Sequence, residues 1–116
     1  MLYEVTTYYL VEGEEKSTTI FFDHKKQVEV YELQQRKKFS NILEDKSLIG
    51  FEFKEYKDNQ PLVIWVENKK ADVIKKFLHH NKIKFDSCGC FDGVRFEFEN
   101  LTANQANYIN DCVKYL

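Results

Sequence analysis

The feature that most constrains the fold is a recurring order of strand-like runs followed by a helix-like segment. Residues 2–11 and 17–22 are rich in Tyr, Thr, Ile and Phe, which favour β-strands, and the polar segment EGEEK between them predicts a turn. Asp23 is a suitable N-cap for a helix over residues 24–44. Part of that segment, QVEVYEL, also alternates as a strand does, and we prefer the helix. Its apolar stripe has helical spacing: Val28, Tyr31, Gln35, Phe39, Ile42 and Leu43.

The same order returns twice. Residues 48–56 alternate, and residues 61–67 are apolar on both faces, which is typical of a central strand covered on both sides. Asn68 can cap a helix over residues 69–81. Its predicted buried stripe is Val73, Ile74, Phe77 and Leu78. Residues 82–86 and 94–99 alternate around the connection SCGCFDG, and a Thr102–Gln105 capping box predicts a last helix over residues 103–115.

These segments predict an α+β fold in one domain over residues 1–116. We expect a two-layer domain in which antiparallel β-hairpins alternate with helices, in the order ββα-ββα-ββα. VIWVEN at 63–68 resembles RFEFEN at 95–100, and IFFDH at 20–24 is a looser copy. This likeness is consistent with a triplicated unit. Any apolar strand followed by a helix cap would look similar. A true internal repeat and a likeness without common origin therefore both stay open.

Charge, hydropathy and cysteine usage limit the class of protein. The net charge is −2, which provides no global attraction to nucleic acid or to an anionic membrane. No apolar run of signal-peptide length follows Met1, and none approaches the ~18 residues of a membrane span. Three cysteines do not form a secreted disulfide framework. We therefore expect a cytoplasmic protein without membrane association.

The stretch HHNKIKFDSCGCFDG at residues 79–93 is the main candidate for chemistry. Thiolates of Cys88 and Cys90 with a histidine could bind zinc, but the cysteines are one residue apart, and adjacent histidines on a helix point about 100° apart. The segment also lacks the Cys-x-x-Cys spacing of redox sites and the glycine elbow of nucleophilic catalysis. No phosphate-binding glycine loop occurs elsewhere. We predict no enzyme activity, no cofactor and no metal, and keep a small metal- or thiol-dependent protein using Cys88 and Cys90 as an alternative.

The predicted second helix is a candidate for nucleic-acid binding. Residues 69–84 carry six lysines against one acid, Asp72. Phosphate contacts need such clusters, although charge on the outer face of a helix usually serves solvation. The nucleic-acid alternative uses this basic face: Lys69, Lys75, Lys76 and His79.

The predicted first and third helices each carry a second apolar side. In the first, Val30 and Leu33 lie opposite the main stripe, and in the third, Tyr108, Cys112 and Tyr115 recur at i, i+4 and i+7. Such a helix either sits in a wide core or meets a partner, and tyrosine is favoured at interfaces. The leading hypothesis is therefore a non-catalytic protein-binding module whose partner is a protein or a second copy of the chain. A small phage or mobile-element inhibitor of a host enzyme or defence system is one such module.

Overall fold

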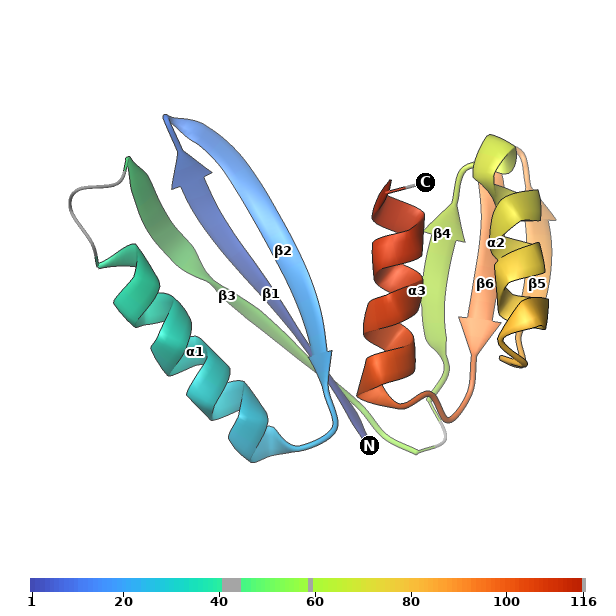
Figure 1. Ribbon diagram of the computed structural model, residues 1–116, viewed down its shortest axis with the longest axis horizontal. Coiled ribbons are helices and arrows are strands. Elements are labelled where there is room, and N and C mark those ends of the chain that lie inside the picture. The colour runs from blue at the N-terminus through green and yellow to red at the C-terminus, as the bar shows by residue number, and fades with distance from the viewer. Residues whose placement is uncertain (41–44, 59, 116) are drawn as a thin grey trace. The chain divides into compact units, whose positions relative to one another are not determined.

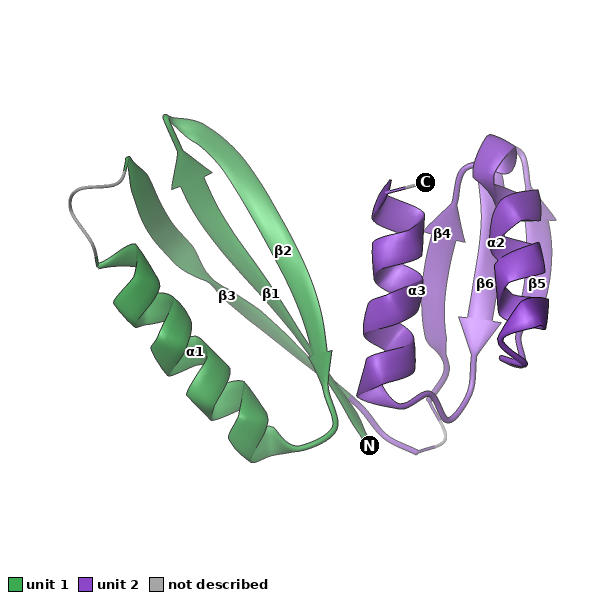
Figure 2. Cartoon of the chain, in the orientation of Figure 1, with its two compact units in different colours: residues 1–55 green, residues 56–116 purple. Residues whose placement is uncertain are grey.

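Within the part of the chain that the structure describes, nine elements alternate pairs of strands with single helices (Figure 1). The computed structural model describes residues 1–40, 45–58 and 60–115. The elements are β1 (Leu2–Val11), β2 (Glu14–Phe22), α1 (Lys25–Phe39), β3 (Lys46–Tyr56), β4 (Leu62–Val66), α2 (Asn68–His80), β5 (Asp86–Cys90), β6 (Gly93–Phe98) and α3 (Ala103–Tyr115). They fall into two compact units, residues 1–55 and 56–116 (Figure 2). The prediction of one domain stays a prediction, because two such units can belong to one domain or to two.

The first unit is a three-stranded antiparallel sheet with the order β2-β1-β3. β1 and β2 form a hairpin whose paired residues run from Tyr3–Phe22 to Val11–Glu14. Its turn places Glu12 and Gly13 at φ values of 52° and 80°. Two successive positive φ values characterise the tight turns that match the twist of a hairpin, and glycine adopts this conformation without strain.

Helix α1 packs on this sheet through aromatic contacts. The rings of Phe22 and Tyr31 and those of Tyr9 and Phe39 each lie 5.2 Å apart, and Val28 is buried. The helix begins after His24, whose backbone N–H donates to Gln27 Oε1 at 3.2 Å, so the cap lies one residue beyond the predicted Asp23. Ile42 and Leu43, predicted for the same stripe, lie outside the described residues.

The second unit has the strand order β4-β6-β5, and both outer strands are antiparallel to β6. One face of this sheet presents buried Val94, Phe96 and Phe98 of β6. Helix α2 packs against β6 and against α3. Ile74 and Leu78 of α2 and Ala106 and Ile109 of α3 are at most 1% exposed and complete the core.

Strand pairing differs from the predicted arrangement in two respects. β3 joins the first sheet and β4 the second, so these two consecutive strands form no hairpin with each other. β4 is also an edge strand, and its Trp65 is 59% exposed, whereas the sequence predicted a central strand covered on both sides. Apolar residues on both faces therefore do not indicate cover on both faces here. The α+β class is confirmed, and the ββα repeat is not.

The strand predicted at residues 82–86 begins later, at Asp86. After α2, Lys82 takes a positive φ of 56°, and the Ile83 N–H donates to Leu78 O at 2.9 Å. This bond spans the end of the helix, as in a Schellman cap, so residues 81–83 complete α2 instead of starting a strand. The two cysteines consequently lie in β5 and not in the turn, which falls at residues 91–92. Within the described residues, no helix has both the length and the apolar character needed to cross a membrane.

Candidate functional site

The predicted stripe on α3 is exposed in the second unit. Tyr108 is 57% exposed and Tyr115 is 76% exposed, while Cys112 between them is partly buried. The opposite side of the helix packs into the core of the unit, where Ala103, Ala106 and Ile109 are buried. The stripe therefore lies where another molecule can contact it.

Helix α2 extends this stripe into a wider apolar surface. The rings of Phe77 and Tyr108 lie 5.0 Å apart, which joins the two helices on their exposed side. Val73, one turn earlier on α2, is 48% exposed. The sequence predicted that Val73 and Phe77 are buried, and this is wrong for Val73 and only partly right for Phe77. We call Val73, Phe77, Tyr108, Cys112 and Tyr115 the α2–α3 surface.

Positive charge accompanies this surface on α2. Lys69 and Lys76 are exposed, and Lys69 Nζ lies 3.5 Å from Glu67 Oε2. Lys70 reaches across to α3, where its Nζ donates to Val113 O at 3.4 Å. Lysines thus share helix α2 with the α2–α3 surface, and their charges favour acidic groups on a binding molecule.

The predicted nucleic-acid residues share α2 but differ in environment. Lys69, Lys76 and His79 are exposed, whereas Lys75 is partly buried. The His79 ring meets the edge of Phe85 at 5.3 Å, so it is held against the connection that follows α2. Three of the four predicted residues are therefore exposed on α2, as is the acidic Asp72, and their role in nucleic-acid binding stays a prediction.

Helix α1 carries a separate apolar site in the first unit. Val30 is 53% exposed and Leu33 is 66% exposed. Val30 also lines a shallow pocket of about 350 Å³ between α1 and the end of β2. The other residues around it are Phe22, Lys26, Gln27, Tyr31 and Gln34. Both predicted α1 residues are thus accessible.

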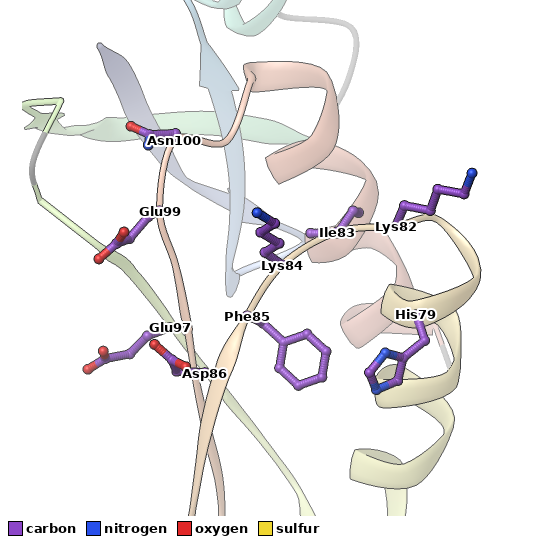
Figure 3. Close-up of a pocket in the computed structure, with 9 residues that line it drawn as sticks. All are labelled: His79, Lys82, Ile83, Lys84, Phe85, Asp86, Glu97, Glu99 and Asn100. Atoms are coloured by element: carbon purple, nitrogen blue, oxygen red, sulfur yellow. The ribbon is translucent and has the colours of Figure 1, made fainter.

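A larger pocket of about 800 Å³ lies beside the segment that follows α2 (Figure 3). Its carboxylates come from Asp86, Glu97 and Glu99, and Asp86 stands directly opposite Glu97 across the β5–β6 pair. Its cationic groups include Lys82 and Lys84. Like charges on facing residues are unfavourable in a sheet, but the guanidinium of Arg95 forms an ion pair with Glu97 and reduces this repulsion. In the described part of the chain, no three His, Cys, Asp or Glu side chains gather closely enough to hold a metal ion.

Cys88 and Cys90 lie on one face of β5, because residues two apart in a strand point the same way. Both thiols are free and exposed, and Cys88 pairs in register with Arg95 of β6. Neither cysteine lines the pocket beside His79. The chemical role of the two thiols stays a prediction.

Val73 and Trp65 are exposed, although the sequence predicted that both are covered. Val73 has the spacing of the predicted stripe of α2, but the buried residues of the helix are Ala71, Ile74 and Leu78, which leaves Val73 outside the core. Trp65 belongs to an apolar run whose edge position depends on strand order. Comparison of the chain with protein-family models, with curated proteins and with solved structures found no match.

Proposed function

We propose that this chain is a non-catalytic protein-binding module that contacts its partner through the α2–α3 surface. The observation that carries the proposal is the exposure of two tyrosines, 57% for Tyr108 and 76% for Tyr115, on a helix that already buries its opposite side. Tyrosine is enriched at the energetic centres of interfaces, because it supplies a large apolar area and a polar end with few rotatable bonds.

The contact between Phe77 and Tyr108 supports this role. It holds the Tyr108 ring against α2 before a partner arrives. A side chain that is already ordered loses less conformational entropy on binding. Lys69 and Lys76 stand on the same helix as Phe77, so the complementary surface has an apolar centre and acidic groups around it.

A module that only binds acts as an adaptor or as an inhibitor of its partner. No recognisable catalytic motif occurs in these residues, which suits an inhibitor that covers a functional surface. The activity of the partner, measured with and without the chain, separates these two roles.

The test is affinity capture by the tagged chain in parallel with variants. Tyr108→Ala combined with Tyr115→Ala should lose a nuclease-resistant protein partner that the wild type retains. Phe91→Ala is the matched control, since it removes a fully exposed aromatic side chain outside the α2–α3 surface. Its capture should equal that of the wild type.

The purified partner then provides the quantitative measurement. Removal of two anchoring tyrosines should weaken binding by about 2–4 kcal/mol, or about 30- to 1,000-fold in Kd, measured by isothermal titration calorimetry. Unchanged affinity of the double variant would contradict the proposal. If Val30→Ala with Leu33→Ala removes binding instead, the interface lies on α1.

Nucleic-acid binding is the second candidate, and the exposure of Lys69, Lys76 and His79 on α2 favours it. Lys75→Glu with Lys76→Glu should then abolish retention on single- or double-stranded DNA and RNA while leaving protein capture intact. Affinity should fall steeply with salt, because phosphate contacts release counterions. Salt-independent or undetectable retention by the wild type would remove this candidate.

A further inference from the structure

Strand β4 is an unusual sheet edge. It pairs with β6 on one side and, within the described residues, is the last strand of its sheet (Figure 1). Its five residues, Leu62–Val66, are all apolar. The other edge strands carry charges: Glu14, Glu15 and Lys16 on β2, Lys46 and Lys54 on β3, and Asp86 on β5. Charged side chains normally protect an edge from pairing with another chain, and β4 has none.

The direction of the β4 backbone groups follows from Gly93. A Cβ built on Gly93 of β6 would lie 2.8 Å from Val66 O, so this carbonyl points toward β6. Because backbone groups alternate in direction along a strand, those of Leu62 and Ile64 also point toward β6. The N–H and C=O groups of Val63 and Trp65 therefore point away from the sheet.

These outward groups match a second copy of the same strand. In an antiparallel pair, two facing residues exchange both hydrogen bonds at every second position. If Ile64 lies on a twofold axis, Val63 of one copy faces Trp65 of the other, and the reverse pair forms by symmetry. All outward N–H and C=O groups of Val63 and Trp65 are then paired, in four hydrogen bonds.

We propose that two copies of this chain associate through their β4 edges in this register, which joins their second units into one six-stranded antiparallel sheet. On the open face, Trp65 of each copy packs against Val63 of the other. On the face with α2 and α3, the two Ile64 side chains meet, and Leu62 faces Val66. Every facing pair is apolar, so no charged group loses its solvent on association.

Exposure of the β4 side chains agrees with this register. Trp65 is 59% exposed, and Val63 and Ile64 are partly exposed. Large apolar side chains of a central strand would be buried, and a second β4 strand beside this one would cover these three. Pro61 precedes the strand and has no N–H to donate, which limits the pairing to these five residues. This association does not depend on the α2–α3 surface, which uses α2 and α3 alone.

Trp65 is the single tryptophan of the chain, so its fluorescence reports on this edge. Sedimentation of the full chain from ~1 μM to ~1 mM should show a transition from one to two copies, a range suited to a small interface. Over the same range, Trp65 emission should shift to shorter wavelength as Val63 of the other copy covers the ring. A monomer throughout, or a dimer with unchanged emission, overturns the proposal.

Val63→Pro is the specific variant, because its lost N–H points away from β6 and so spares the sheet of the same copy. By symmetry the dimer loses two hydrogen bonds, and its Kd should rise by more than about tenfold. Val63→Thr keeps the N–H and a β-branched shape, and it should dimerise within a few-fold of the wild type. Dimerisation of Val63→Pro at wild-type affinity would overturn the proposal.

Hydrogen exchange on the wild type needs no folded variant. The amides of Val63 and Trp65 should gain protection as the concentration rises, whereas the amide of Ile64, already directed toward β6, should not change. Equal gains in protection at the three amides, or no gain at any of them, would contradict the proposed β4–β4 register. The Tyr108→Ala, Tyr115→Ala variant should dimerise normally, so failure of this proposal and failure of the proposed function are distinguishable.

Discussion

The hydroxyl of Tyr8 on β1 donates a 2.7 Å hydrogen bond to Glu52 Oε2 on β3 and links the two strands by side chains forty-four residues apart in sequence. This bond raises the pKa of Tyr8 above its ordinary value, because the phenol must keep its proton to donate, and desolvation and the negative charge of Glu52 add to the effect. Strand β3, whose partner the sequence did not reveal, is thus attached to β1 by a titratable contact.

The first prediction concerns the alkaline titration of Tyr8. Its folded pKa is raised, so the stabilisation is fully present below the ordinary tyrosine pKa and is lost as pH rises through the folded pKa. We expect the ring carbon signal of Tyr8 in NMR to titrate at higher pH in the folded chain than in urea. Glu52→Gln removes the charge and should lower the pKa, whereas an unaltered titration would show that Glu52 is not the cause.

The second prediction concerns the start of α3. The Gln105 N–H donates to Thr102 Oγ1 at 3.2 Å, and the Thr102 N–H donates to Gln105 Oε1 at 3.1 Å. Thr102→Ala leaves the Gln105 N–H without its side-chain acceptor and should lower the free energy of unfolding by about 1 kcal/mol in urea titration. Thr102→Ser keeps the acceptor and should cost much less. An equal decrease in the free energy of unfolding for both variants would show that the Thr102 side-chain cap is not the cause of the destabilisation.

The third prediction compares two glycines in the β5–β6 hairpin. A Cβ at Gly93 would lie 2.8 Å from the Val66 carbonyl oxygen, and both are backbone-bound, so β4 and β6 must move apart. We expect Gly93→Ala to destabilise the fold by about 1–3 kcal/mol. A Cβ at Gly89 meets nothing within 4 Å, so Gly89→Ala should be neutral or stabilising by up to about 1 kcal/mol. Urea unfolding of both variants measures the two changes in the free energy of unfolding. A larger decrease for Gly89→Ala than for Gly93→Ala would contradict the prediction.

The fourth prediction concerns the reactivity of the three thiols. Burial raises the pKa of Cys112, and the neighbouring Asp111 carboxylate adds to the shift. At pH 8 a smaller fraction of the Cys112 thiol is ionised than a cysteine with the ordinary pKa would show, and the thiol is also less accessible. Cys112 should therefore react more slowly with a disulfide reagent than the exposed Cys88 and Cys90. Peptide mass spectrometry of time-resolved labelling gives the order. In urea the three rates should converge, and a native Cys112 that reacts first would contradict the assignment.

Much of the local structure was predictable, because the interactions that set it lie close together in the chain. The Thr102–Gln105 capping box is formed, and α3 runs over the predicted residues. Tyr108 and Tyr115 are exposed, whereas the sequence left open whether this side of α3 lies in a wide core or meets a partner. Helical spacing could not place Val73, since the margin of a buried stripe depends on which helix lies beside it.

The sequence by itself determined the α+β class, the alternation of strands with helices and the bounds of α3, because residue spacing and caps act over a few positions. Tertiary structure decided that β3 pairs with β1 and β4 with β6, and that Leu62–Val66 forms an edge. Alternation shows which side chains share a face of a strand but not which strand lies next to it. That choice depends on hydrogen bonds and packing between residues far apart in the chain, such as Tyr8 with Glu52 and Val66 with Val94.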